Sequence, residues 1–240
     1  MVYELRMYHA APGRLDDLVE RIGRVLPPFF DRHGFPPRLG QWTVSAGPAM
    51  PMLAWLLCWP GGFDQRTRSF AALGADPEWQ AIRQETNGAG EMVRQYDLRF
   101  LTPSPAWKRP AASGGSLPPR PVEAEVFELR VHAVPVGSIG AASEILATSY
   151  LPSVTKSGAT ILGVFENQTG PSTPGVTILL GWRSFEERRK GLGSFEALPD
   201  GRSNTAANVL GPCACILLEP TSYGRPNHNL RPGHECTTSL

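Results

Sequence analysis

The stretch Tyr3-Glu4-Leu5-Arg6-Met7-Tyr8 decides the fold, because it occurs again 124 residues later as Phe127-Glu128-Leu129-Arg130-Val131-His132. Both stretches alternate apolar and polar side chains, which is typical of a β-strand with one apolar face. Further matches follow in the same order, at offsets of 124 and then 123: Gly13 with Gly137, Gly34 with Gly158, Gly40 with Gly163, Trp42 with Phe165, and Trp59 with Trp182. Such a collinear series indicates an internal duplication.

Each copy has the same predicted order of elements, β-α-β-β-α-β. In the first copy the predicted strands are residues 3–9, 38–46, 52–59 and 94–102, with helical patterns in residues 15–26 and 63–90. This order is that of the split-βαβ, or ferredoxin-like, unit, with an antiparallel sheet and both helices on one face. Two such sheets can bury their bare faces against each other. We therefore predict an α+β fold in which two tandem units form a pseudo-two-fold barrel of the dimeric type within one chain.

Composition divides the chain into two repeats, a linker and a tail. The expected boundaries are residues 1–102 and 123–222 for the repeats, 103–122 for the linker and 223–240 for a polar tail. Six prolines in the linker predict an extended segment without helix or strand pairing, because proline lacks an N–H donor and fixes φ. The second helix of the second repeat is expected to be degraded, because four helix-disfavouring residues crowd it: Gly191, Gly193, Pro199 and Gly201.

The overall composition predicts a soluble, cytoplasmic protein. The chain is 41% hydrophobic and 19% charged, with a net charge of +1 and no basic stripe, so nucleic-acid binding is not indicated. No apolar run approaches the roughly 18 residues that cross a bilayer, so no membrane contact is expected. Cys213 and Cys215 lie too close together for an ordinary disulfide, which favours reduced thiols. Spacings typical of metal ligands, phosphate loops or a Ser-His-Asp set are missing, so we expect neither a metal nor a bound cofactor.

Several short motifs resemble the NIPSNAP family of the dimeric α/β-barrel superfamily. They are Tyr3-Glu4-Leu5-Arg6-Met7-Tyr8 with Pro12-Gly13, His33-Gly34, Gly40-x-Trp42 and Ala75-Asp76-Pro77-Glu78-Trp79. The second copy keeps Phe127-Glu128-Leu129-Arg130 and Gly137 but lacks the Asp-Pro-Glu-Trp segment. The resemblance implies the barrel fold. It also implies a superfamily that includes cofactor-free monooxygenases, cyclases, isomerases, lyases, haem enzymes and non-catalytic proteins, with no general catalytic motif to transfer.

Strand alternation suggests which side chains face the centre of the barrel. We expect the apolar faces, such as that of Leu5, to meet the helices. The opposite faces are then expected to point into the barrel, bringing together Glu4, Arg6, Tyr8, Glu128, Arg130 and His132. On neighbouring strands Glu166 is expected on the cleft side, and Trp42 is either a core residue or part of a ligand cage. Asp97 and Arg99 either join the polar lining or face solvent at an edge.

Two interpretations of these charges remain open. Glu and Arg two residues apart on a strand can be structural ion pairs, since buried charges must be paired. Alternatively, the arginines hold a carboxylate, phenolate or enolate while a carboxylate moves protons. The replacement of Tyr8 by His132 breaks the symmetry with a group that titrates near neutral pH. The functional interpretation assigns catalysis to His132, Glu128, Tyr8 and Glu4, and substrate binding to Arg6, Arg130, Trp42 and Glu166.

The resulting hypothesis is a cofactor-independent enzyme of specialised metabolism, with a small molecule as its partner. It would carry out acid–base chemistry (cyclisation, isomerisation or elimination) on an acidic, aromatic or unsaturated substrate in the cleft between the sheets. One alternative is a non-catalytic small-molecule-binding or scaffold protein, and another is a cofactor-independent monooxygenase. A haem enzyme is disfavoured, because His132 is the only cleft histidine. An internal barrel neither requires nor forbids a homodimer.

Overall fold

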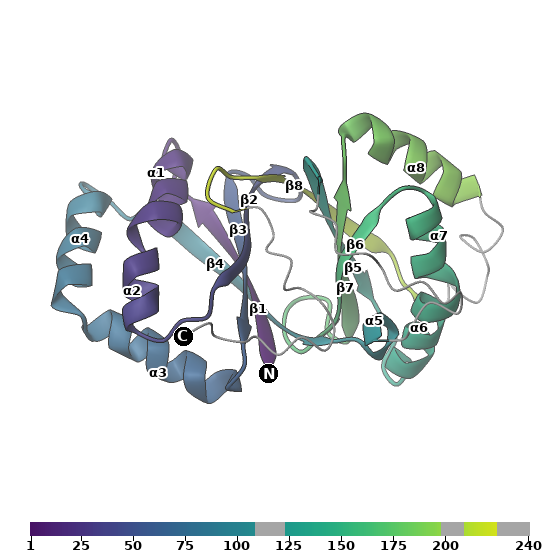
Figure 1. The fold of residues 1–240 in the computed structure, drawn as a ribbon, viewed down its shortest axis with the longest axis horizontal. Coiled ribbons are helices and arrows are strands. Elements are labelled where there is room, and N and C mark those ends of the chain that lie inside the picture. Colours follow the sequence, from purple (N-terminus) through teal and green to yellow (C-terminus); the bar gives the residue numbers. More distant parts are fainter. Residues whose placement is uncertain (109–122, 198–208, 225–240) are drawn as a thin grey trace.

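The computed structural model describes residues 1–108, 123–197 and 209–224, and it contains two α+β repeats (Figure 1). The first repeat comprises β1 (Val2–Ala10), α1 (Leu15–Glu20), the π-helix η1 (Arg21–Val25), α2 (Pro27–Arg32), β2 (Arg38–Ala46), β3 (Met52–Trp59), α3 (Gly62–Ala75), α4 (Pro77–Asn87) and β4 (Val93–Pro103). The second comprises β5 (Val126–Ala133), α6 (Ile139–Ile145), the π-helix η2 (Leu146–Tyr150), α7 (Leu151–Lys156), β6 (Thr160–Asn167), β7 (Gly175–Trp182), α8 (Phe185–Ala197) and β8 (Cys213–Pro220). The predicted duplication is confirmed.

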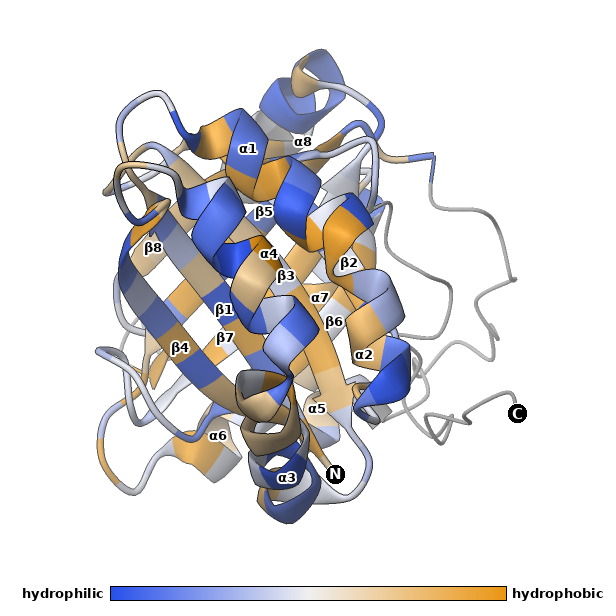
Figure 2. Cartoon of the chain, turned by 90° about the vertical axis from the view of Figure 1, so that its left-hand side faces the viewer, coloured by the Kyte–Doolittle hydropathy of each residue, from blue (hydrophilic) through white to orange (hydrophobic). Residues whose placement is uncertain are grey.

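The eight strands close into one antiparallel barrel in the order β1-β3-β2-β8-β5-β7-β6-β4. Two ladders join the repeats: β2 pairs with β8, and the end of β4 pairs with β6 through Leu101–Asn167 and Pro103–Phe165. The helices lie outside the barrel, those of the first repeat on one side and those of the second on the other (Figure 1). Figure 2 looks onto the helices of the first repeat, which cross in front of its strands. The predicted α+β barrel within one chain is therefore confirmed.

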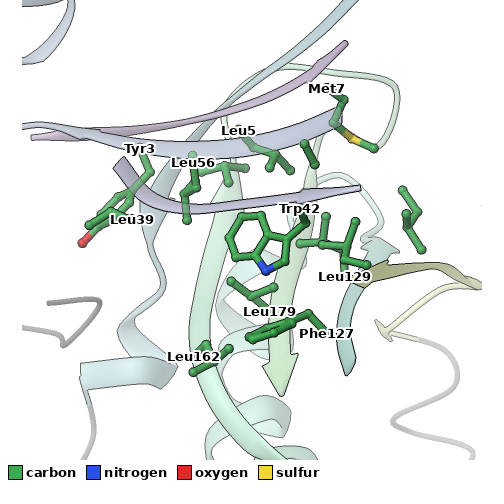
Figure 3. Packing of buried hydrophobic residues seen from close by; sticks show 14 of the residues in the cluster. Tyr3, Leu5, Met7, Leu39, Trp42, Leu56, Phe127, Leu129, Leu162 and Leu179 are labelled. Atoms are coloured by element: carbon green, nitrogen blue, oxygen red, sulfur yellow. The ribbon is translucent and has the colours of Figure 1, made fainter. Parts of the chain in front are cut away.

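Apolar side chains from both repeats fill the centre of the barrel. Tyr3, Leu5 and Met7 of β1 belong to the same buried cluster as Phe127 and Leu129 of β5 (Figure 3). Trp42 and Phe165 occupy equivalent places in this cluster, and each ring folds back over a glycine two residues earlier on its own strand. The barrel interior is thus a packed hydrophobic core.

This packing shows that the sequence-based assignment of strand faces is wrong. The apolar faces of β1 and β5 point into the barrel, and Glu4, Arg6, Tyr8, Glu128, Arg130 and His132 point toward the helices. Alternation separated the two faces correctly. It could not say which face is central, because the helix layer buries the polar face as well: seven consecutive residues of β1, Val2 to Tyr8, are buried.

Each repeat ends in a short segment that crosses onto the other repeat. After β4, Ser104 N donates to Val164 O at 2.9 Å; after β8, Thr221 N donates to Gln41 O at 3.1 Å. Gln41 and Val164 are equivalent residues of β2 and β6, so the two contacts are reciprocal. We call these segments, 103–108 and 221–224, the straps.

The first strap corrects the expectation that residues 103–122 lack helix and strand pairing. Pro103 still pairs with Phe165, and α5 (Pro105–Lys108) places Trp107 against the Phe165 ring, with a centroid separation of 5.2 Å. Apolar contact with the other repeat outweighs the effect of the prolines here, and Pro105 stands at the first position of a helix, where proline is tolerated. The rest of the predicted linker, and residues 225–240 of the predicted tail, lie outside the described residues.

The Asp-Pro-Glu-Trp motif begins α4. Asp76 caps this helix by accepting hydrogen bonds from the backbone N–H groups of Glu78 (2.9 Å) and Trp79 (3.2 Å). His33, at the end of α2, contacts Asp76 Oδ2 at 2.7 Å and so ties the helices together. In the second repeat α8 ends at Ala197, and the remainder of the expected degraded helix is not described. None of the described helices has the length and apolar character to cross a membrane.

Candidate functional site

A buried polar network lies between the sheet and the helices of the first repeat. The carboxylate of Glu4 accepts hydrogen bonds from Trp59 Nε1 at 2.8 Å and from Arg66 Nε and Nη2, both at 2.9 Å. Arg6 also pairs with Glu4, and its Nε donates to the hydroxyl of Tyr8 at 2.8 Å. Glu4 is 0% exposed and Arg6 is 6% exposed. Each charged group therefore has a partner, as burial requires.

Aromatic rings enclose the two arginines of this first network. The Arg6 guanidinium lies 5.3 Å from the ring centroid of Trp55 and 4.6 Å from that of Phe70. The Arg66 guanidinium lies 4.8 Å from Phe70 and 5.1 Å from Phe100. Cation–π attraction of this kind stabilises a guanidinium that has little access to water. The charged groups of the first network are therefore satisfied by partners and rings within the first repeat.

The second repeat repeats the network around Glu128. This carboxylate accepts from Trp182 Nε1 at 3.0 Å, from Arg130 Nε at 2.7 Å, and from Arg188 Nε and Nη2 at 2.9 and 3.2 Å. Burial alone would raise the pKa of Glu128, but the hydrogen bond from Arg188 and the charge of Arg130 hold it below its usual value. Glu128 is therefore a carboxylate at neutral pH and a weak proton acceptor.

A chain of hydrogen bonds that involves His132 distinguishes the second network. Arg130 Nη1 donates to the Tyr150 hydroxyl at 3.0 Å, and His132 Nε2 lies 3.2 Å from the same hydroxyl. His132 Nδ1 lies 3.1 Å from the carbonyl oxygen of Gly211, which can only accept, so Nδ1 carries the proton. Burial lowers the pKa of His132, so the ring is neutral at pH 7 and Nε2 accepts from Tyr150.

Tyr150 is a residue of this site that the sequence did not indicate. It ends the π-helix η2, and π-helical turns often occur at functional sites. Burial raises its pKa to about 12, so the phenol stays protonated and can donate to His132. No sequence signal marked this residue, because its contact with His132 depends on how the helix packs on the sheet.

Two exposed thiols border the second network. In the ladder between β5 and β8, Cys213 lies opposite His132 and Cys215 opposite Arg130. Cys215 Sγ donates to Glu128 Oε1 at 3.1 Å and accepts from Arg188 Nη2 at 3.4 Å. Although Cys215 is exposed as a residue, its thiol is partly desolvated against the network, and this together with the neighbouring carboxylate raises the pKa of Cys215 to about 12, so it is a neutral thiol. Both cysteines are exposed, so solvent reaches the strand beside the network.

Within the described residues, the charged and polar side chains of β1 and β5 that were expected in a single cleft form two separate networks. Glu4, Arg6 and Tyr8 belong to the first network, and Glu128, Arg130 and His132 belong to the second. The arginines and tryptophans contributed by β3, β7, α3 and α8 were missed as partners. A sequence signal for them existed, because Arg66 and Trp59 recur as Arg188 and Trp182 in the duplication.

The other two predicted site residues lie apart from both networks. Trp42 is 0% exposed inside the barrel, and its Nε1 has no hydrogen-bond partner among the described residues. Glu166 alternates with the barrel-facing Phe165 and so belongs to the outer face of β6, where its register partners are Thr102 and Val176. Asp97 and Arg99 do turn toward the barrel, opposite Met7 and Leu5, and pair with each other at 3.1 Å.

The second network does not fit a metal or a haem iron. Both ring nitrogens of His132 already have partners. Across the three described ranges, no cluster of three or more His, Cys, Asp or Glu side chains is placed to hold a metal ion. The network holds two guanidinium groups, one carboxylate and a hydrogen bond between Tyr150 and His132.

An eight-stranded barrel of two ferredoxin-like repeats, with polar networks beneath its helices, defines an α+β barrel protein of the dimeric type. The NIPSNAP family model matches residues 3–107 and 127–223, so the chain belongs to the NIPSNAP family. The resemblance inferred from the short motifs is confirmed. A search of curated proteins finds no significant match.

Solved structures that resemble this chain include several different proteins, two of which match with TM-scores above 0.5 over most of both chains. An anthrone oxidase-like protein has a TM-score of 0.52 at 14% identity, over 92% of this chain and 91% of that chain. A variant of chlorite dismutase from Candidatus Nitrospira defluvii has a TM-score of 0.52 at 8% identity, over 91% of each chain. A NIPSNAP family protein from Agrobacterium tumefaciens matches 43% of this chain and 93% of its own length, with 17% identity and a TM-score of 0.37. Some proteins with this fold are therefore enzymes, and these likenesses show the fold alone.

Proposed function

We propose that the protein is a cofactor-independent small-molecule enzyme that carries out acid–base chemistry at the second network. The substrate is acidic, aromatic or unsaturated, and the reaction is a cyclisation, isomerisation or elimination. The observation that carries the proposal is the relay from Tyr150 to a neutral His132, at 3.2 Å, beside Arg130. The site lies between the sheet and the helices rather than inside the barrel.

The relay supplies both partners of a proton transfer. A neutral His132 Nε2 can accept a proton through the Tyr150 hydroxyl, and the resulting imidazolium keeps its bond to the Gly211 carbonyl. Arg130 and Arg188 stabilise negative charge that develops on the substrate, because guanidinium groups bind carboxylates and enolates through charge-assisted hydrogen bonds. Glu128 holds the two arginines in place, so it is a positioning residue in this mechanism.

The first network has a structural role in this proposal. Rings enclose its arginines. The Tyr8 hydroxyl accepts a hydrogen bond from Arg6, and the position equivalent to His132 is Tyr8 itself, so the first network has no histidine to receive a proton. In this proposal Glu4 and Tyr8, predicted to be catalytic, and Arg6, predicted to bind substrate, instead stabilise the first repeat. The replacement of Tyr8 by His132 at equivalent positions thus distinguishes the first network, which is structural in this proposal, from the second network, which is functional.

The non-catalytic alternative is favoured by one specific observation. The space between the sheets, where a cleft was expected, is filled by the barrel core (Figure 3). A packed barrel suits a small-molecule-binding or scaffold protein, in which both networks are ion-paired supports. The enzyme and the non-catalytic protein differ in one measurable respect: only the enzyme converts an acid that binds at the second network.

Solvent exchange tests the proposal. The full chain is incubated in D₂O with a panel of β-keto acids, unsaturated carboxylic acids and phenols, and proton NMR detects deuterium uptake and new products. We expect uptake or turnover with at least one acid, reduced by roughly 100-fold or more in His132→Phe and Tyr150→Phe, because general acid–base groups contribute factors of that size.

Tyr8→Phe is the matched control, because it alters the equivalent position of the first repeat. We expect it to keep the wild-type rate. Binding without exchange in any compound would indicate the non-catalytic protein. Oxygen uptake with oxygenated products would indicate the cofactor-independent monooxygenase.

A further inference from the structure

The two repeats differ in the size of the side chains around equivalent arginines. Arg66 and Arg188 make the same pair of hydrogen bonds to Glu4 and Glu128. The register of each closing strand gives the equivalent neighbours, first repeat and then second: Tyr96 and Cys213, Leu98 and Cys215, Phe100 and Leu217. On the helices, Phe70 stands four residues after Arg66, and Leu192 stands four residues after Arg188.

In the first repeat, protein rings occupy the space over the guanidinium of Arg66. Phe70 lies 4.8 Å and Phe100 5.1 Å from it, measured to the ring centroids. Phe63 packs edge-on against Phe100 with a centroid separation of 4.8 Å, and Tyr96 packs against Tyr8 at 4.7 Å. The outer face of β4 is therefore lined with rings.

In the second repeat the same positions carry no rings. Leu192 and Leu217 are half-buried, and Cys213 and Cys215 are exposed. Phe185 is equivalent to Phe63, and like Phe63 it is 50% exposed, but the residue equivalent to Phe100, the ring partner of Phe63, is Leu217. Three aromatic side chains of the first repeat are thus replaced by smaller ones along β8 and α8, and Cys215 of the same strand contacts Arg188 at 3.4 Å.

We propose that the second repeat binds a planar aromatic anion, such as an aromatic carboxylate or a phenolate, in this place. The ligand ring lies over Arg188, where Phe70 and Phe100 lie over Arg66, with Cys213, Cys215 and Leu217 beneath it on β8. Its negative charge is attracted by the network, which contains two guanidinium groups and one carboxylate. In this proposal the ligand ring takes the place that the side chains of Phe70 and Phe100 occupy in the first repeat.

This inference rests on the proposed function and makes its substrate class narrower. A guanidinium attracts an aromatic face and not a saturated ring of similar size, because the attraction arises from the ring quadrupole. The residues that set this specificity are Leu192 and Leu217. Neither belongs to the proton relay of His132 and Tyr150.

The test compares two acids of matched size, benzoate and cyclohexanecarboxylate, by isothermal titration calorimetry on the full chain. We expect benzoate to bind at least about fivefold more tightly, which is within the range of one cation–π contact. Leu217→Phe restores the ring of the first repeat, and we expect it to weaken benzoate binding by about tenfold or more. Leu217→Ile is the matched control and should bind benzoate as the wild type does. Thermal unfolding of both variants verifies that they are folded.

Thiol labelling locates the bound ligand independently. In a Cys236→Ser background, benzoate should slow the alkylation of Cys213 by iodoacetamide, and cyclohexanecarboxylate at the same concentration should slow it less. Cys58 is buried and serves as the internal unreactive thiol. Unchanged labelling of Cys213 at saturating benzoate would overturn the location.

The outcomes separate this inference from the proposed function. Equal affinity for the two acids, or wild-type benzoate binding by a folded Leu217→Phe variant, overturns the aromatic site, even if other acids are turned over. A benzoate preference that Leu217→Phe removes supports the site, even if no compound exchanges with solvent. In that second case the proposed enzyme is wrong and an aromatic-acid-binding protein remains.

Discussion

The indole of Trp42 lies directly over Gly40, so that a Cβ atom at residue 40 would come within 2.2 Å of the ring. The second repeat has the same relationship, with Phe165 over Gly163 and a distance of 2.4 Å. The Gly-x-Trp motif is therefore a packing device that lets a large ring fold back along its own strand into the barrel core.

Gly40→Ala should destabilise the protein by about 1–3 kcal/mol, because the buried ring must move within a packed core. Gly193→Ala is the matched control: nothing lies within 4 Å of its Cβ position in α8, and alanine is the better helix former. We expect the control to be neutral or stabilising by up to about 1 kcal/mol. Urea denaturation of both variants measures the difference, and equal effects would contradict the packing role.

Two tryptophans allow the hydrogen bond to Glu4 to be separated from packing. Trp59 Nε1 donates to Glu4 Oε2 at 2.8 Å, whereas Trp42 Nε1 has no partner among the described residues. Both indoles are fully buried, so replacement by phenylalanine costs both sites similar packing. Trp59→Phe should therefore be more destabilising than Trp42→Phe by about 1.5–3 kcal/mol, the usual contribution of a bond to a charged group. Chemical denaturation checks this, and a larger loss for Trp42→Phe would be inconsistent with it.

His132 should make the stability of the protein depend on pH near neutrality. Burial lowers its pKa, so the unfolded chain binds the proton more readily than the folded chain. Stability is then fully present above the unfolded pKa of about 6.5 and falls as the pH drops below it. Urea midpoints at pH 8 and pH 5.5 should differ less in His132→Phe than in the wild type. Tyr8→Phe should keep the wild-type difference, and an unchanged difference in His132→Phe would count against the buried neutral histidine.

The two repeats should remain associated when the connection between them is cut. The ladders β2–β8 and β4–β6 and both straps hold the repeats together independently of residues 109–122. A protease site inserted between Lys108 and Glu123 allows cleavage after folding, and size-exclusion chromatography should then show one complex of unchanged size. Elution of two separate fragments under native conditions would contradict this.

Much of the fold could be predicted from the sequence, because a duplication repeats every signal. The matched strands, glycines and tryptophans gave the order of elements and the barrel. The face of β1 could not be predicted, since both faces are buried and the carboxylate of Glu4 is satisfied by a hydrogen bond from Trp59 and an ion pair with Arg66. These partners stand 55 and 62 residues further along the chain. The periodicity of a strand shows which residues share a face. Only tertiary packing decides which neighbouring side chains pair with the charges on that face.

The candidate site was predicted only in part for the same reason. Glu128, Arg130 and His132 share one strand, so their proximity follows from alternation alone. Tyr150 reaches His132 from a different element, and nothing in its local sequence marks that contact. The expected helix-free linker failed where Trp107 packs on Phe165, a contact that depends on the other repeat.

The presence of both repeats on one chain, where each strap contacts the other repeat, affects which substitutions the protein can tolerate. In a barrel assembled from two identical chains, every substitution appears twice, and the assembly dissociates on dilution. With both halves on one chain, each half meets the other at a fixed effective concentration, whatever the protein concentration. A histidine can then replace a tyrosine in one half while the other half keeps its full complement of rings. Gene fusion thereby frees one half to lose stabilising contacts that its twin continues to supply.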